Sequence, residues 1–140
     1  MIKSIISLKY VTKSDGQFLY ELLLEREPSV NISHKKIPTF QQHLKFINSK
    51  PYSRWYIIKK NDQKIGSIYL TKQNEIGIFV KKEFQKEGLG MKSMKLLIMK
   101  NPRSRYLANI NPKNLKSTKF FKKFGFKLIQ HTYELAVDKL

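Results

Sequence analysis

Residues 75–90, EIGIFVKKEFQKEGLG, decide how the rest of the sequence is interpreted. Residues 75–80 are apolar enough for a strand, and residues 88–100 continue with apolar side chains at helical spacing. Between the two patterns, Gly88 and Gly90 let backbone amides face outward without side-chain obstruction, and the start of a helix adds its positive dipole end. Such a loop is suited to hold a pyrophosphate, although two glycines at this spacing also fit a tight turn or a helix cap.

Outward from this segment, strand and helix patterns follow one another. The expected strands cover residues 2–11, 54–60, 64–71, 75–80, 105–110 and, as a closing strand or pair, 127–136. The expected helices cover residues 14–26, 39–50, 88–100 and 114–124. Turns at Asn61-Asp62 and Gln73-Asn74 favour an antiparallel meander of the middle strands. The order strand, helix, strand over residues 75–110 then implies a parallel pair joined by a right-handed crossover.

Length and composition exclude several classes of protein. The 140 residues fit one domain, residues 1–140, and a hydrophobic content of 41% excludes a disordered chain. There are no cysteines, so disulfides, thiolate-ligated metals and cysteine nucleophiles are excluded. No apolar run approaches the roughly 20 residues that span a bilayer. We therefore expect a soluble, cytoplasmic protein with neither a membrane partner nor a metal site.

The net charge of +18 favours a polyanionic partner such as nucleic acid, an anionic membrane or a phosphorylated small molecule. Of the 28 basic residues, 24 are lysine and only 4 are arginine, the residue on which nucleic-acid readers depend for bidentate contacts. The net charge is +7 over residues 1–80 and +11 over residues 81–140. The second part is therefore more basic than the first, but the basic residues do not form a tail. A solvated lysine-rich surface is an equally open interpretation, and we expect no specific nucleic-acid partner.

Two segments resemble the cofactor-binding segments of one family. Residues 85–90, with the pattern Q-x-x-G-x-G after a strand and at the start of a helix, resemble the acyl-CoA-binding signature of the GNAT family of N-acetyltransferases. Residues 107–117, LANINPKNLKS, followed by Phe121 and Gly125-Phe126, are similar to the family's second cofactor segment. With the order of elements, the resemblance covers essentially the whole chain. It implies the GNAT acyl-CoA N-acyltransferase fold, an α/β fold whose mixed central sheet of six to seven strands is flanked by helices, about four in number.

The resemblance implies acetyl-CoA (coenzyme A) as the cofactor and assigns residues to it. The pantetheine arm would lie beside Ile78, Phe79 and Val80, and the N–H of Val80 would meet the developing oxyanion. Asn114 would bond the pantetheine arm, and the ring of Phe121 would pack on the cofactor. The residues assigned to the pyrophosphate are Gln85, Lys86, Glu87, Gly88, Leu89 and Gly90. The cations assigned to the adenosine phosphate are Lys122 and Lys92.

The chemistry that the resemblance implies is attack of a neutral amine on the acetyl thioester, which a general base assists at neutral pH. Glu75 stands where many relatives carry a carboxylate that acts through water. The alternative is that Glu75 only pairs with a neighbouring lysine. Many relatives place a tyrosine where this chain has Phe121, so the group that protonates the leaving thiolate is open between Tyr133 and water.

Residues for the acceptor are His34, in a polar loop between the early helices that often lines the acceptor side in this family, and Asn109, on the strand over residues 105–110. A polar surface loop remains the alternative for His34. We expect an N-acetyltransferase that acts on a primary amine of a small molecule or peptide, with an amino-sugar nucleotide first because its phosphates suit the lysine-rich surface. The alternatives are a protein or peptide N-acetyltransferase and, from another class, a basic nucleic-acid-binding module or a CoA-binding domain without activity. We expect a monomer or a homodimer.

Overall fold

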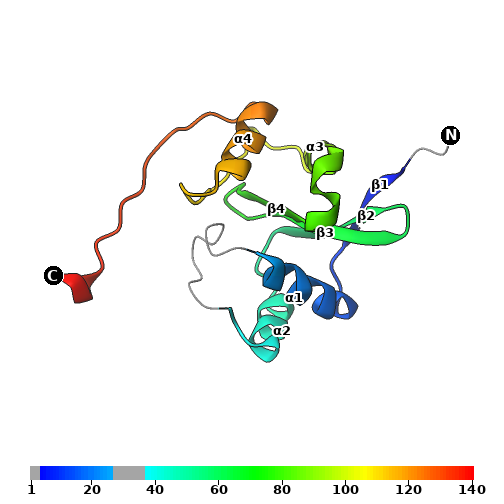
Figure 1. Ribbon diagram of the computed structural model, residues 1–140, viewed down its shortest axis with the longest axis horizontal. Helices are drawn as coiled ribbons and strands as arrows, with labels where there is room; N and C mark the ends of the chain where they lie inside the picture. Colours follow the sequence, from blue (N-terminus) through cyan, green and yellow to red (C-terminus); the bar gives the residue numbers. More distant parts are fainter. Residues whose placement is uncertain (1–3, 27–36) are drawn as a thin grey trace.

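The structure is a computed structural model that describes residues 4–26 and 37–140 (Figure 1). Within these residues, four antiparallel strands form one sheet in the order β1-β2-β3-β4. The strands are β1 (Ile6–Tyr10), β2 (Arg54–Lys60), β3 (Gln63–Leu70) and β4 (Ile76–Val80). The predicted meander is confirmed. Its hairpin turns contain Asn61 and Asn74 at φ of 56° and 66°, in the left-handed region that asparagine tolerates.

Helices cover both faces of this sheet, as Figure 1 shows. The α-helices are α1 (Gly16–Glu25), α2 (Phe40–Asn48), α3 (Leu89–Lys100) and α4 (Leu115–Phe124). The short 3-10 helices are η1 (Lys13–Asp15), η3 (Lys82–Glu87) and η4 (Val137–Lys139). Alternating side chains of β2 separate two cores: Ile57 packs with α1 and α2, whereas Tyr56 and Ile58 pack with α3 and α4. The sheet is therefore the middle layer of three.

The prediction of a strand over residues 105–110 is wrong. Leu107 alone makes a parallel bridge, to Glu75, in which the N–H of Ile76 donates to the Leu107 carbonyl at 2.8 Å. Beyond this bridge the chain turns toward α4, and the N–H of Asn114 closes the turn on a carbonyl three residues earlier at 2.8 Å. The turn draws the backbone away from β4, so the predicted parallel pair is reduced to one point.

The predicted closing strand over residues 127–136 is also wrong. These residues leave the body of the molecule as an extended chain (Figure 1), in which Leu128 and Tyr133 are 72% and 89% exposed. A strand needs a regular edge of N–H and C=O groups to join, and the backbone of residues 105–110 does not provide one. In the described part of the chain, the sheet thus has four strands instead of the six to seven expected, while the four α-helices agree with the expectation.

A buried carboxylate joins β1, β3 and α1. Asp15 is fully buried, and its oxygens lie 3.0 Å from Lys9 Nζ and 2.7 Å from Lys64 Nζ. The N–H of Thr12 donates to the same carboxylate at 2.8 Å. Burial alone would raise the pKa of Asp15, but the hydrogen bonds from Lys64, Thr12 and Lys9 outweigh burial and lower the pKa to about 2. The charged form of Asp15 therefore stabilises the folded chain.

We predict that Asp15→Asn lowers the free energy of unfolding, because asparagine keeps the shape but offers no charge to Lys9 and Lys64. The pKa of Asp15 falls from its ordinary 3.8 to about 2 in the folded chain, which is worth about 2 kcal/mol. This stabilisation is present above about pH 4 and is lost as the pH falls toward about 2. In urea unfolding, the difference in unfolding free energy between wild type and variant should therefore be largest near neutral pH. It should disappear as the pH falls toward about 2.

The control for this prediction is Asp62→Asn, in the exposed turn between β2 and β3. It should leave the unfolding free energy within about 0.5 kcal/mol of wild type. A difference between wild type and Asp15→Asn that stays constant from neutral to acid pH would contradict the role given to the charge.

Candidate active site

The outer edge of β4 is open over most of its length. The N–H of Lys81 donates to the Ile65 carbonyl at 2.8 Å, so Val80 and its partner Gly66 form a non-hydrogen-bonded pair. The N–H and C=O of Val80 therefore point away from β3, and so do those of Ile78 by the alternation of the strand. Among the described residues no strand lies beyond them, because the chain has already left β4 after its one bridge. A ligand with amide groups can add to this edge as a strand does.

The loop after β4 brings the predicted pyrophosphate residues to the surface. Gln85 Nε2 donates to the Val80 carbonyl at 2.8 Å, which fastens the loop to the end of the strand. Gly88 has a φ of 73°, which residues with a Cβ rarely adopt, and no heavy atom lies within 4 Å of where a Cβ would stand. Leu89 is buried and anchors the start of α3. The exposed residues of the loop include Gln85, Lys86, Glu87 and Gly88.

The second predicted cofactor segment lies beside the first. Gly90, in the first turn of α3, is in close contact with the Phe120 ring of α4, since an added Cβ would lie 2.9 Å from a ring carbon. Asn114 is the N-cap of α4, and its Oδ1 accepts from the N–H of Ser117 at 3.1 Å. The cap uses the oxygen of the Asn114 carboxamide, and its Nδ2 is a donor of two further hydrogen bonds. The start of α3 therefore packs against the middle of α4, whose N-cap is Asn114.

Phe121 lies inside the core between α4 and the sheet. It is 5% exposed, and its ring packs at centroid distances of 5.2 Å from Phe120 and 5.0 Å from Phe126. Its place is thus set by packing within the protein. Lys122, the next residue on α4, and Lys92, on α3, are exposed.

At the other end of β4, the structure brings two predicted site residues together. Asn109 Nδ2 donates to one oxygen of Glu75, and Thr71 Oγ1 donates to the other at 3.0 Å. The parallel bridge at Glu75 explains the first contact, because it aligns the start of β4 with the segment that carries Asn109. No lysine forms an ion pair with Glu75 in the part of the chain that is described, so the alternative of a surface pair is not seen there. Thr71 was not predicted, although its place four residues before Glu75 across a tight turn is a usable signal.

An aromatic cluster covers the α1/α2 side of the sheet near this carboxylate. Tyr69 lies over Gly77, where an added Cβ would be 2.1 Å from a ring carbon, and its ring stacks on that of Tyr52 at 3.8 Å and 3°. The guanidinium of Arg26 lies 5.5 Å from the centre of the Phe79 ring. Burial raises the pKa of the Tyr52 phenol, with a further increase from Tyr69 and an opposing effect of Arg26. This cluster was not predicted from the sequence, although a tyrosine opposite a strand glycine is a recognisable cross-strand pair.

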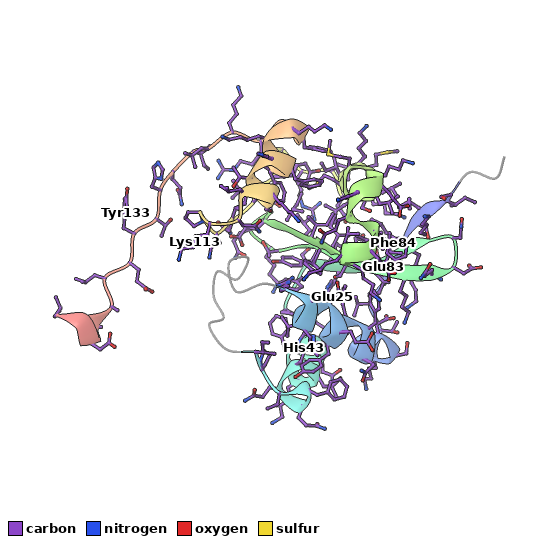
Figure 2. All side chains as sticks on the ribbon, in the orientation of Figure 1. Glu25, His43, Glu83, Phe84, Lys113 and Tyr133 are labelled. Atoms are coloured by element: carbon purple, nitrogen blue, oxygen red, sulfur yellow. The ribbon has the colours of Figure 1, made fainter. Side chains whose placement is uncertain are left out.

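Two predicted residues are not brought to this edge. Figure 2 shows Tyr133 on the extended C-terminal segment, away from the sheet, where the side chain is 89% exposed. His34 lies outside the described residues. Within those residues, no three His, Asp or Glu side chains are grouped to hold a metal ion. No helix there is long and apolar enough to cross a membrane.

Comparison with known proteins identifies the family. Residues 17–126 match the acetyltransferase (GNAT) family. Because the match covers most of the sequence, the chain belongs to the GNAT family of acetyltransferases, whose members use acetyl-CoA. A comparison with curated protein sequences gives no match.

Solved structures share the fold at low sequence identity. A domain from Methanocaldococcus jannaschii is 22% identical, with a TM-score of 0.80 and 94% of each chain covered. Spermidine N-acetyltransferase from Vibrio cholerae, in complex with CoA and spermine, is 17% identical, with a TM-score of 0.75 over 90% of this chain and 83% of that one. RimL, a ribosomal-protein alpha-N-acetyltransferase in complex with coenzyme A, is 15% identical, with a TM-score of 0.71 over 93% and 84%. Likeness at these identities shows the fold alone.

We predict that Gly88→Val weakens acetyl-CoA binding at least about tenfold, because valine at a φ of 73° distorts the loop whose amides face the ligand. Isothermal titration calorimetry measures the change. Gly125→Val, at a φ of 120° after α4, is the matched control, since it places similar strain outside the loop. Equal affinity of wild type and Gly88→Val would remove this loop from the cofactor site.

Proposed function

We propose that residues 1–140 form one catalytic domain that transfers an acetyl group from acetyl-CoA to a primary amine of a small molecule. The observation that carries the proposal is the open edge of β4, with the exposed Gly88 loop at one end and the hydrogen-bonded carboxylate of Glu75 at the other. A cofactor can enter from the loop end and an amine from the carboxylate end. Membership of the GNAT family supports acetyl-CoA as the acetyl donor.

The residues at this edge fit acetyl-CoA. The outward N–H and C=O of Ile78 and the outward N–H of Val80 match the amides of a pantetheine arm, which can pair with them as a strand would. The Val80 carbonyl already accepts from Gln85 Nε2. The exposed loop backbone and the N-terminal dipole of α3 suit a pyrophosphate. Asn114 Nδ2 can donate to the pantetheine arm, and Lys92 and Lys122 are exposed cations for the adenosine phosphate.

The proposed chemistry assigns one task to each end of β4. Acetyl-CoA supplies an acetyl group activated as a thioester. An amine attacks only in its neutral form, so Glu75 accepts the ammonium proton through water. Thr71 and Asn109 donate to the two oxygens of Glu75 and hold the carboxylate in place. At the loop end, the outward N–H of Val80 donates to the oxygen on which negative charge develops.

Charge favours an amino-sugar nucleotide as the acceptor. A net charge of +18 attracts phosphate groups and repels a polycation such as a polyamine. The name of the Vibrio cholerae relative includes spermidine, but at 17% identity it supports the fold and not the substrate. A protein N-terminal amine is the second candidate. The name of the ribosomal-protein relative includes such an acceptor, but at 15% identity it too supports the fold and not the substrate.

A thiol-release assay separates these acceptors. Acetyl-CoA is offered with amino-sugar nucleotides, polyamines and peptides with free N-termini, and we expect release with the first group. Release with peptides alone would favour the second candidate. A basic nucleic-acid-binding module, or a CoA-binding domain without activity, would release no thiol with any amine.

We predict that Glu75→Gln slows turnover roughly 10²–10⁴-fold at neutral pH, because glutamine keeps the shape but cannot accept a proton. The affinity for acetyl-CoA, measured by calorimetry, should be retained. The rate of the variant should recover in part as the pH rises and the amine loses its proton in solution. Glu21→Gln, an exposed acid on α1, is the control and should keep the wild-type rate. A wild-type pH–rate profile in Glu75→Gln would leave Glu75 with a structural role only.

A further inference from the structure

A pocket outside the β4 edge lies where β1 ends and β2 begins. Its volume is about 620 Å³, within the range of small-molecule sites. Three cationic and three aromatic side chains line it, together with small polar and aliphatic ones, and no carboxylate is among the described lining residues. The cations are Lys13, Lys50 and Arg54, and the aromatic residues are Tyr10, Tyr52 and Trp55.

The positive charge of this pocket is not neutralised within the described chain. None of the ion pairs seen there includes Lys13, Lys50 or Arg54. Asp15, which follows Lys13 by two residues, is buried and already paired with Lys9 and Lys64. All three pocket cations are exposed, so they are free to meet an anion with several negative oxygens.

The aromatic side chains add a second requirement to the ligand. Tyr10 stacks on Tyr56 at a centroid distance of 4.9 Å and is still 61% exposed. Tyr52 and Trp55 meet edge to face at 4.8 Å, and the indole N–H of Trp55 is occupied by Ser67 at 2.8 Å. Tyr52 and Trp55 offer flat apolar surface near the cations, which suits the stacking of a planar base. Tyr10 lies with Tyr56 on the opposite face of the sheet. A ligand that is both polyanionic and planar has the chemistry of a nucleotide.

The pocket is connected to the carboxylate at the start of β4. Trp55 pairs with Tyr69 and Tyr69 pairs with Gly77, so all three share the α1/α2 face of the sheet with Glu75, two residues before Gly77. Tyr52 lines the pocket and stacks on Tyr69, which makes a continuous aromatic surface between the two places. From β2 to β4 the distance is two strand spacings, roughly 10 Å. A sugar carried on a diphosphate can span such a distance.

We infer that this pocket holds the nucleoside diphosphate part of the acceptor while its amino group reaches the β4 edge, from which its proton passes to Glu75 through water. The inference rests on the proposed acetyl transfer and adds to it a binding site on β1, α2 and β2. Lys13, Lys50 and Arg54 bind the diphosphate, and Tyr52 and Trp55, on the α1/α2 face, contact the base. The amine end crosses Tyr69 to reach the β4 edge.

The test is calorimetry with free uridine, thymidine, guanosine and cytidine diphosphates, and with inorganic pyrophosphate, on protein saturated with CoA. Saturation with CoA keeps these probes out of the Gly88 loop. We expect at least one nucleoside diphosphate to bind more tightly than pyrophosphate, because the rings contribute. In the triple variant Lys13→Gln, Lys50→Gln, Arg54→Gln, its affinity should fall at least about tenfold.

The matched control is Lys95→Gln, Lys100→Gln, Arg103→Gln, which removes the same charge from exposed residues on and after α3. Arg103 resembles Arg54 closely, since each donates from Nη1 to the preceding carbonyl, at 3.0 and 2.9 Å. Thermal unfolding of both triple variants checks that the fold is kept. Equal weakening by both would mean attraction by net charge alone and would overturn the pocket assignment.

The assignment and the proposed function fail in different ways. If CoA binds and thiol is released with an amine, but no nucleoside diphosphate binds or binding is unchanged in the first triple variant, the pocket assignment is wrong and acetyl transfer stands. If CoA does not bind the wild-type protein, the proposed function fails, and the inference built on it fails with it.

Discussion

The single bridge between Glu75 and Leu107 is the constraint on which the candidate site depends. It is made by the N–H of Ile76 to the Leu107 carbonyl and the N–H of Leu107 to the Asn74 carbonyl, both at 2.8 Å. At the bridge, the start of β4 is fixed against the segment that carries Asn109. Past the bridge the backbones separate, and the outward N–H and C=O of Ile78 and N–H of Val80 face no strand in the described part of the chain. A ladder that continued along β4 would occupy these groups, because backbone donors and acceptors in a sheet are paired almost completely.

The two faces of the sheet differ in function because successive side chains of β4 point to opposite faces. Ile76, Ile78 and Val80 face α3 and α4, where they complete the larger apolar core. Glu75, Gly77 and Phe79 face the opposite side. Packing against α3 and α4 thus holds the strand still, while the other face presents a carboxylate and aromatic rings. The outward amides lie at the edge between the two faces, so a bound thioester and an amine can approach from different directions.

Much of the fold follows from local patterns in the sequence, and the site follows from them only in part. The helix predicted over residues 39–50 is α2, and Thr39 and Gln42 form a capping box at its start. Asn114 likewise caps α4, and the helix predicted over residues 88–100 is α3. These features need only neighbours along the chain. The predictions of strands over residues 105–110 and 127–136 are wrong. An alternation of apolar residues shows that a segment can pair as a strand, but not that the fold offers a sheet edge for it to pair with. The hydrogen bond between Glu75 and Asn109 depends on that long-range pairing. The two residues could therefore be named from the sequence, but the contact between them could not be predicted.

The open edge also bears on the leaving group of the proposed reaction. The resemblance to the family leads to the expectation of a tyrosine where this chain has Phe121, which is 5% exposed among Phe120 and Phe126. A hydroxyl buried there without a partner would cost about 1–3 kcal/mol, so packing favours the phenylalanine. Tyr133, on the extended segment, is 89% exposed and away from the sheet. A thiol has an ordinary pKa of about 8.5, so its thiolate leaves readily near neutral pH and takes a proton from water afterwards. Since the edge that admits a ligand also admits water, the proposed reaction can proceed with water in place of a side-chain acid.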